Sequence, residues 1–230
     1  GMTAPDAVRD GAWWADAWAN SQWIHAARNS FVIGISSTLI ATALGTLAAL
    51  GLSRPEMPFR RAVMALLISP MIVPMIISAT GLFFFYSKAG LAHTYVGIVL
   101  AHAMLGIPFV IITVTATLAG FDRSLIHAAA SLGASPVTTF RKVILPLILP
   151  GVISGALFAF VTSFDEVVVV LFVASYDQQT IPLQMWNGIR EQISPTILAA
   201  ATILVLFSIA LLTTLELLRR RTERLRGLSG

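Results

Sequence analysis

The chain has 230 residues, of which 57% are hydrophobic and 11% charged, whereas soluble domains carry about 25% charged residues. The mean hydropathy of +0.83 agrees with this comparison and excludes an ordinary soluble domain, so the composition indicates an integral membrane protein. The sequence contains no cysteine, which excludes disulfides, cysteine nucleophiles and thiolate metal sites.

Residues 1–30 form the first predicted segment, which is extracytoplasmic and interfacial. They lack the long apolar stretch of a signal peptide. Trp14 and Trp18 lie one helical turn apart, and tryptophan concentrates at membrane–water interfaces. We therefore expect residues 11–25 to form a short helix on the outer interface, with a disordered leader as the alternative.

Five apolar runs reach the length of about 20 residues that a helix needs to cross a bilayer. They cover residues 31–53, 62–87, 94–121, 143–164 and 197–215, all within a transmembrane domain of residues 31–219. We expect the fourth run to continue as a helix through Asp165 and Glu166 to about residue 174. The predicted fold is an all-α integral membrane protein with about five transmembrane helices.

Prolines fall inside two of these runs. Pro70 and Pro74 lie in the second run, and Pro108 lies in the third. Each removes a backbone hydrogen bond, so we expect each to interrupt and kink its helix. In membranes such breaks are tolerated inside the protein or beside a cavity; ordinary packing kinks are the alternative.

Basic residues lie mostly on one side of the predicted topology. Of the 15 Lys and Arg residues, 11 fall in the connections after the first and third runs or in the C-terminal tail. Positively charged connections face the cytoplasm. The N-terminus is therefore predicted outside the membrane, with the basic tail, residues 220–230, inside. We interpret the tail as a topology signal that contacts membrane lipid, and we expect no nucleic acid as a partner.

The connection at residues 121–146 is longer than a simple link and carries the signals of two short helices. Asp122 is a suitable N-cap for a helix that ends at Leu132, and Gly133 suits the left-handed position after it. Ser135 is a second N-cap with Pro136 after it. We expect this second helix to run to about Leu145 and to stop before Pro146.

The first of these helices has a small, smooth face at Ala128, Ala129 and Leu132, which can dock into a groove on another protein. One alternative is a helix pair that only covers the end of the bundle. Another is a DNA-binding helix-turn-helix, because residues 132–143 have its rhythm. A position between two membrane spans argues against DNA.

The stretch HAAASLGASPVTTFRKVILPLILPG, residues 127–151, resembles the coupling-loop motif of ABC importer permeases. That motif reads Glu-Ala-Ala, three residues, Gly, about nine residues, and an aliphatic ending in Leu-Pro. Ala128, Ala129, Gly133, Ile144, Leu145 and Pro146 fit this motif at its spacing. By the resemblance, the residues of the ATPase-coupling loop are His127, Ala128, Ala129, Gly133, Ala134, Leu145 and Pro146. His127 stands where the family usually has glutamate. The resemblance implies a loop that sits in a cleft of a cytoplasmic ATPase and transmits its motion.

Further stretches at residues 101–113, 163–174 and 180–186 resemble the spermidine/putrescine-type permeases, and the similarity covers roughly residues 23–218. The resemblance implies a permease subunit of a prokaryotic plasma (inner) membrane that takes up a polyamine or related amine. Its implied partners are a second permease, an ATPase dimer and an extracytoplasmic solute-binding protein. Alternatives are a permease for another small solute, such as an opine, an amino-phosphonate or ferric iron, or an ion-coupled carrier or channel. The remaining alternative is a structural membrane scaffold, but this function gives no reason for the acidic pair Asp165 and Glu166.

Asp165, Glu166 and His102 are the candidate pathway residues. A charged side chain inside a membrane costs at least about 2.5 kcal/mol unless it is paired or hydrated, so it is a functional candidate. Adjacent residues of a helix point about 100° apart, so one acid can face the pathway while the other faces a neighbour. Acidic groups suit a cationic cargo. The alternative is a structural role, with His102 or an arginine of another subunit as the partner. His102 itself is either a pathway group or an interhelical hydrogen-bond donor or acceptor.

The chain is not predicted to be an enzyme. Neither Lys88 nor Lys142 follows a glycine, so the Gly-Lys-Ser/Thr of a phosphate-binding loop is absent from the sequence. ATP hydrolysis is therefore expected on a separate subunit. No catalytic residue, cofactor or metal site is predicted.

Overall fold

A computed structural model describes residues 21–54, 56–122 and 124–191 and, further on, residues 197–198, 201–202, 204–211, 213–214 and 217. Helices and turns form all the regular structure in these residues, as predicted. The predicted interfacial helix lies outside them except for residues 21–25, which belong to the first described helix. The basic tail also lies outside them. Of the fifth predicted span, the described residues are helical.

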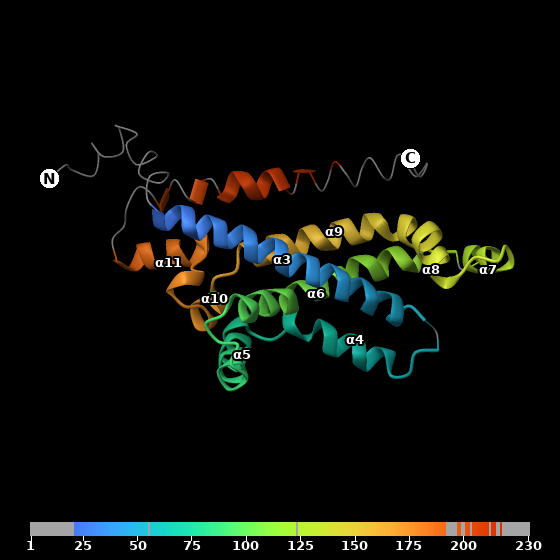
Figure 1. Cartoon of the computed structure of the whole chain (residues 1–230), viewed down its shortest axis with the longest axis horizontal. Helices are drawn as coiled ribbons and strands as arrows, with labels where there is room; N and C mark the ends of the chain where they lie inside the picture. The colour runs from blue at the N-terminus through green and yellow to red at the C-terminus, as the bar shows by residue number, and fades with distance from the viewer. Residues whose placement is uncertain are drawn as a thin grey trace.

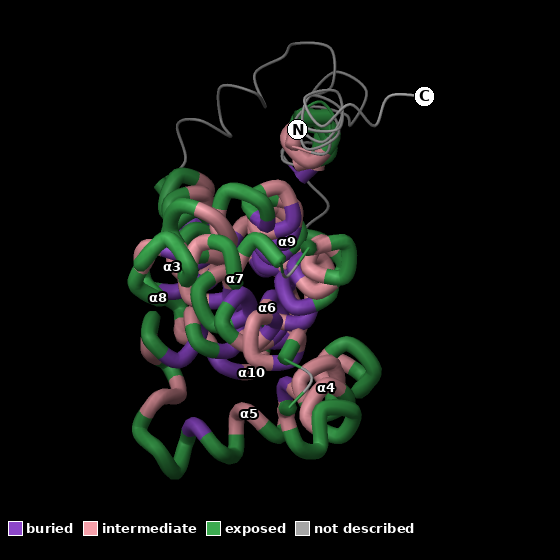
Figure 2. Tube along the Cα trace, turned by 90° about the vertical axis from the view of Figure 1, so that its right-hand side faces the viewer, coloured by how far each residue is buried: buried purple, intermediate pink, exposed green. Residues whose placement is uncertain are grey.

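Three long helices pack against one another at the centre of the molecule: α3 (Ser21–Leu52), α6 (Tyr95–Ala119) and α9 (Leu145–Phe164). Figure 1 shows them running along the long axis, and Figure 2 shows buried residues concentrated where they meet. α3, α6 and the helix that contains α9 are each long and apolar enough to cross a membrane. The first, third and fourth predicted runs are therefore helices, although α3 begins ten residues before its run.

Small residues let these three helices approach closely. A Cβ atom added at Gly106 in α6 would lie 2.8 Å from the Cβ of Ala159 in α9 and 3.2 Å from the Cβ of Ala41 in α3. A Cβ added at Gly155 in α9 would lie 2.7 Å from the Cα of Val110 in α6. Membrane helices associate through such contacts because lipid provides no hydrophobic driving force between helices. Larger residues at these glycines would separate the helices.

The second predicted span is sharply bent. α4 (Arg60–Ile68) and a following 3₁₀ turn (Ser69–Met71) meet α5 (Met75–Ala89) at 98°. Pro70 and Pro74 lie at this break, where two missing backbone donors within five residues prevent a continuous helix. The predicted interruption is confirmed. Length and composition fit either one broken span or a re-entrant loop, and Figure 2 shows the pair as a lobe beside the central bundle.

The interruption predicted at Pro108 is not observed. α6 continues through this residue from Tyr95 to Ala119, and the proline is fully buried. A single proline removes only one backbone hydrogen bond. Packing of α6 between α3 and α9 holds the helix together on both sides of Pro108.

The far end of the bundle is closed by α10 (Val168–Val173), a 3₁₀ turn (Tyr176–Gln178) and α11 (Ile181–Glu191). The carbonyl oxygen of Asp177 in this turn lies 2.9 Å from three side-chain atoms. These are His25 Nε2 and Asn29 Nδ2 from α3, and the hydroxyl of Tyr95 from α6. The start of α3 is thereby tied to the connection between α10 and α11.

Candidate functional site

The connection between α6 and α9 contains the predicted pair of short helices. They are α7 (Ser124–Ser131) and α8 (Pro136–Thr139), separated by residues 132–135. Figure 1 places them at one end of the molecule, opposite α10 and α11. The pair is called the coupling loop below, over residues 121–146.

The start of α7 follows from Asp122. Its Oδ1 atom accepts a hydrogen bond from the backbone N–H of Ser124 at 2.9 Å. Hydrogen bonds from the hydroxyl and the backbone N–H of Ser124 hold the pKa of Asp122 below its usual range. A side chain that accepts a hydrogen bond from an otherwise unpaired backbone N–H in the first helical turn stabilises that end of the helix. Asp122 therefore acts as the predicted N-terminal cap.

The elbow between the two helices has the predicted backbone geometry. Gly133 has a φ of +77°, which residues with a Cβ rarely adopt. The N–H of Ala134 donates to the carbonyl of Ala129 at 3.0 Å, which satisfies a carbonyl at the end of α7. Ser135 then caps α8 by accepting from the N–H of Thr138 at 3.3 Å, with Pro136 in the first turn.

The second helix of the coupling loop does not stop before Pro146, contrary to the prediction. It passes through a π-helical turn, Phe140–Ile144, directly into α9, so Pro136–Phe164 is one helix of 29 residues. A proline lacks an N–H, and its ring clashes with the carbonyl four residues earlier. The wider turn, in which the N–H of Leu145 bonds to the carbonyl of Phe140, accommodates Pro146 within the helix.

The predicted coupling residues differ in exposure. His127, Ala128, Gly133 and Pro146 are exposed, and Ala129, Ala134 and Leu145 are half-buried. Two apolar side chains project further: Leu132 is 88% exposed and Val137 is 65% exposed. Val137 was not among the predicted residues, although an apolar residue directly after Pro136 in a capped helix is a usable signal. Exposed apolar side chains of this kind mark a surface that contacts a partner.

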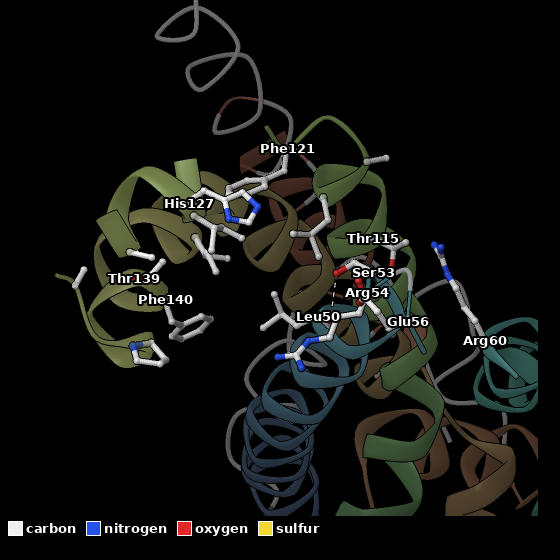
Figure 3. A pocket seen from close by; sticks show the side chains of 17 residues that line it. Leu50, Ser53, Arg54, Glu56, Arg60, Thr115, Phe121, His127, Thr139 and Phe140 are labelled. Atoms are coloured by element: carbon white, nitrogen blue, oxygen red, sulfur yellow. Dashed lines mark hydrogen bonds between the residues drawn. The ribbon is translucent and has the colours of Figure 1, made fainter. Parts of the chain in front are cut away.

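A pocket of about 880 Å³ lies behind the coupling loop and is called the loop pocket below. The end of α3, the α3–α4 connection, the end of α6 and the coupling loop all line it. Figure 3 shows Arg54 and Arg60 on one side of the loop pocket and His127 on the other. No local sequence signal marks this pocket, because four segments far apart in the chain form it.

The acidic pair lies at the opposite end of the long helix. The prediction of a continuous helix through Asp165 and Glu166 to residue 174 is wrong. α9 ends at Phe164, and a new helix, α10, begins at Val168. Glu166 is 7% exposed. Its carboxylate accepts backbone N–H groups of the first turn of α10, from Val168 at 2.9 Å and Val169 at 2.8 Å. The helix breaks here because the side chain of Glu166 starts a new one.

His102 and Glu166 come together inside the bundle, whereas Asp165 does not join them. His102 is buried in α6, with Nδ1 2.7 Å from the Ser163 hydroxyl and Nε2 3.9 Å from Glu166 Oε2. The hydroxyl of Ser37 donates to that of Ser163 at 3.0 Å, so the network joins α3, α6 and α9. His102 thus makes an interhelical hydrogen bond, one of its two predicted roles. Asp165 is exposed on this chain.

This arrangement offers exposed side chains for binding at two places, which one long helix connects. Within the described part of the chain, no group of three or more His, Asp or Glu side chains could hold a metal ion. One exposed carboxylate lies at the α9–α10 break, and exposed apolar side chains lie on the coupling loop. A single helix of 29 residues connects them.

Comparisons with known proteins agree with this architecture. Residues 41–224 match the family of binding-protein-dependent transport system inner membrane components. The spermidine/putrescine transport system permease protein PotC of Haemophilus influenzae is 35% identical over 211 residues, which cover 92% of this chain and 82% of that protein. A probable molybdenum ABC transporter permease protein of Haloferax volcanii is 34% identical over 175 residues, covering 73% of this chain and 65% of that protein.

The fold also matches a solved structure. The MetNI methionine ABC transporter, in an inward-facing conformation, superposes with a TM-score of 0.70 at 18% identity, covering 96% of this chain and 99% of that chain. At this identity the match shows the fold alone. The family match, the identity to PotC and the helical membrane architecture lead to one conclusion. The chain belongs to the binding-protein-dependent transport system inner membrane components, the permease subunits of ABC importers.

Proposed function

We propose that this permease carries a polyamine or a related amine, and that Asp165 lines the pathway. The observation that carries the choice of cargo is the exposed carboxylate of Asp165 at the α9–α10 break. A carboxylate inside a membrane protein attracts a cation and is costly without one. The relative PotC, by its name a spermidine/putrescine permease, supports the same choice.

The proposed orientation follows from the basic residues. The coupling loop and the C-terminus face the cytoplasm, because 11 of the 15 basic residues lie on that side. The start of α3 and the α10–α11 connection then face outward, where an extracytoplasmic solute-binding protein delivers the cargo. A second permease subunit completes the pathway across the bilayer.

The proposed mechanism is alternating access driven by a separate ATPase dimer. The exposed Leu132 and Val137 of the coupling loop dock into the ATPase surface. When the two ATPase subunits close, they move the coupling loop. Because the loop continues into α9 without a break, the motion reaches the α9–α10 break and opens the pathway outward.

Uptake by a reconstituted complex tests this function. The chain, its partner permease, the ATPase and the binding protein are reconstituted in proteoliposomes, and accumulation of radiolabelled spermidine, putrescine and molybdate is measured with internal or external ATP. We expect ATP-dependent accumulation of an amine and none of molybdate. Vesicles that lack this chain are the control. Accumulation of molybdate, or of an opine, an amino-phosphonate or ferric iron in place of amines, would refute the proposed cargo.

A further inference from the structure

The loop pocket lies at the level where three spanning helices reach one surface of the bundle. α3 ends at Leu52, α6 ends at Ala119, and the helix Pro136–Phe164 begins beside them. With the orientation proposed above, on which this inference rests, that surface is the cytoplasmic face of the membrane. The loop pocket is therefore within reach of lipid headgroups.

The charge of the loop pocket is positive. Arg54 and Arg60 line one side, and Glu56 contributes the one carboxylate among its lining residues. In the described part of the chain, neither arginine has a carboxylate within 4.0 Å. His127 lines the opposite side (Figure 3), at the position where the resemblance above would place a glutamate. None of the coupling-loop residues that line the loop pocket carries a negative charge.

The walls of the loop pocket are apolar. Its lining includes Leu50 at the end of α3, Leu118 at the end of α6, and Phe140 and Ile144 of the π-helical turn. A soluble anion would satisfy the arginines and leave these walls in contact with water. A lipid satisfies both, because its acyl chain contacts the walls while its phosphate binds the guanidinium groups.

We propose that the loop pocket binds one anionic phospholipid, with its phosphate on the side lined by Arg54 and Arg60. Basic pockets between helices on the cytoplasmic side are known to bind anionic headgroups. The bound lipid contacts both the end of α3 and the inner side of the coupling loop, and it supports the loop from behind. Leu132 and Val137 do not line the loop pocket, so they stay free to contact a protein partner.

Native mass spectrometry of the full-length chain, purified in detergent with its partner subunits, tests the site. The probes are phosphatidylglycerol and phosphatidylcholine at equal concentration. We expect one tightly bound phosphatidylglycerol and no preference for phosphatidylcholine. Each basic residue near a membrane surface is worth about 1 kcal/mol, so Arg54→Gln and Arg60→Gln should each weaken phosphatidylglycerol binding about fivefold.

Matched variants separate this site from general surface charge. Arg190→Gln removes an equally exposed arginine from α11 at the other end of the molecule and should leave binding unchanged. Arg54→Lys keeps the charge and should retain most of the binding. His127→Glu places a carboxylate in the loop pocket and should weaken binding at least as much as Arg54→Gln, whereas the neutral His127→Gln should not. Equal binding by Arg54→Gln, Arg60→Gln and Arg190→Gln would overturn the proposal.

Two further arms identify the occupant. Inorganic phosphate at a hundredfold excess should not displace phosphatidylglycerol; full displacement would show a soluble anion site and overturn the lipid. If Arg54→Gln dissociates the ATPase in lipid-free detergent, the loop pocket belongs to the ATPase interface, and the lipid proposal is likewise wrong. Lipid binding is measured without transport, so its failure leaves the proposed cargo standing, and failed amine uptake leaves the lipid site standing.

Discussion

Asp165 and Glu166 are adjacent carboxylates with different surroundings. Glu166 is buried, and its oxygens accept from the N–H groups of Val168, Val169 and Val170 at 2.8–3.3 Å. Asp165 is exposed on this chain. A buried acceptor for several backbone N–H groups holds local structure together, whereas an exposed carboxylate is free to meet a cargo. The two residues therefore have separable roles in the permease.

Neutral isosteres of the two acids should behave differently. Asp165→Asn should lower amine uptake at least tenfold while complex yield and thermal stability stay near wild type, because it removes only an exposed charge. Glu166→Gln places an NH₂ group against a backbone N–H and leaves a buried donor unsatisfied, which costs about 1–3 kcal/mol. It should lower the thermal midpoint and the yield together with uptake.

The measurements are radiolabelled spermidine uptake and thermal unfolding, made on the same preparations of both variants. Full uptake by Asp165→Asn would remove this carboxylate from the pathway. A Glu166→Gln protein of unchanged stability but abolished uptake would show that Glu166, rather than Asp165, contacts the cargo.

At the scale of the element, the coupling loop consists of two short, capped helices joined by a tight turn at Gly133. Gly133 turns the chain with a positive φ, and a Cβ added there would meet nothing within 4 Å. The requirement for glycine is therefore conformational. A side chain at this position also extends from the loop surface next to Leu132, where a partner would dock.

Gly133→Val should leave insertion into the membrane intact and weaken ATPase association and transport. A residue with a Cβ costs about 1–2 kcal/mol in the left-handed region, and more when it is β-branched. Gly120→Val is the control, because Gly120 caps α6 near the same loop with a φ of −92° and equally open space. Co-purification of the ATPase and coupled uptake are measured. Equal values for the two variants would show that the coupling loop only covers the bundle.

The caps of the coupling loop were predictable because they depend on local chemistry. A side chain at Asp122 or Ser135 reaches an N–H two or three residues away, and Gly133 needs only its own backbone freedom. Continuity through Pro146 was not predictable in this way, since it depends on a π-helical turn supported by neighbouring helices. The end of α9 before Asp165 was missed because an apolar run hides a helix break when the capping residue is buried.

At the scale of the whole molecule, the central bundle is well defined by α3, α6 and α9, and the bent pair α4–α5 extends beside it. The length of the apolar runs predicted the three long helices. They did not distinguish a kinked span from the 98° bend at Pro70 and Pro74, because hydropathy records the length of a run and not its direction. The long helices connect the coupling loop at one end of the molecule to the α9–α10 break at the other end.

Reporter fusions test the orientation of the bundle. A reporter fused after Gly230 should show cytoplasmic activity, and one fused after Ser87 at the end of α5 should show external activity, because the basic connections face the cytoplasm. Reversed activity at both positions would overturn the orientation. Cytoplasmic activity at both would show that α4 and α5 form a re-entrant loop and return to the side from which they started.

The helix Pro136–Phe164 has no break, so a force on one end would be carried along its length. Its 29 residues span about 43 Å at 1.5 Å per residue. If it tilts about its midpoint by about 5°, each end is displaced by about 2 Å, and the two ends move in opposite directions. If α8 is pushed inward, such a tilt would swing Phe164, and with it Asp165, outward from the axis of the bundle. A hinge at Pro146 would absorb the same push within one turn, whereas a helix that continues through the π-helical turn would carry it to the α9–α10 break.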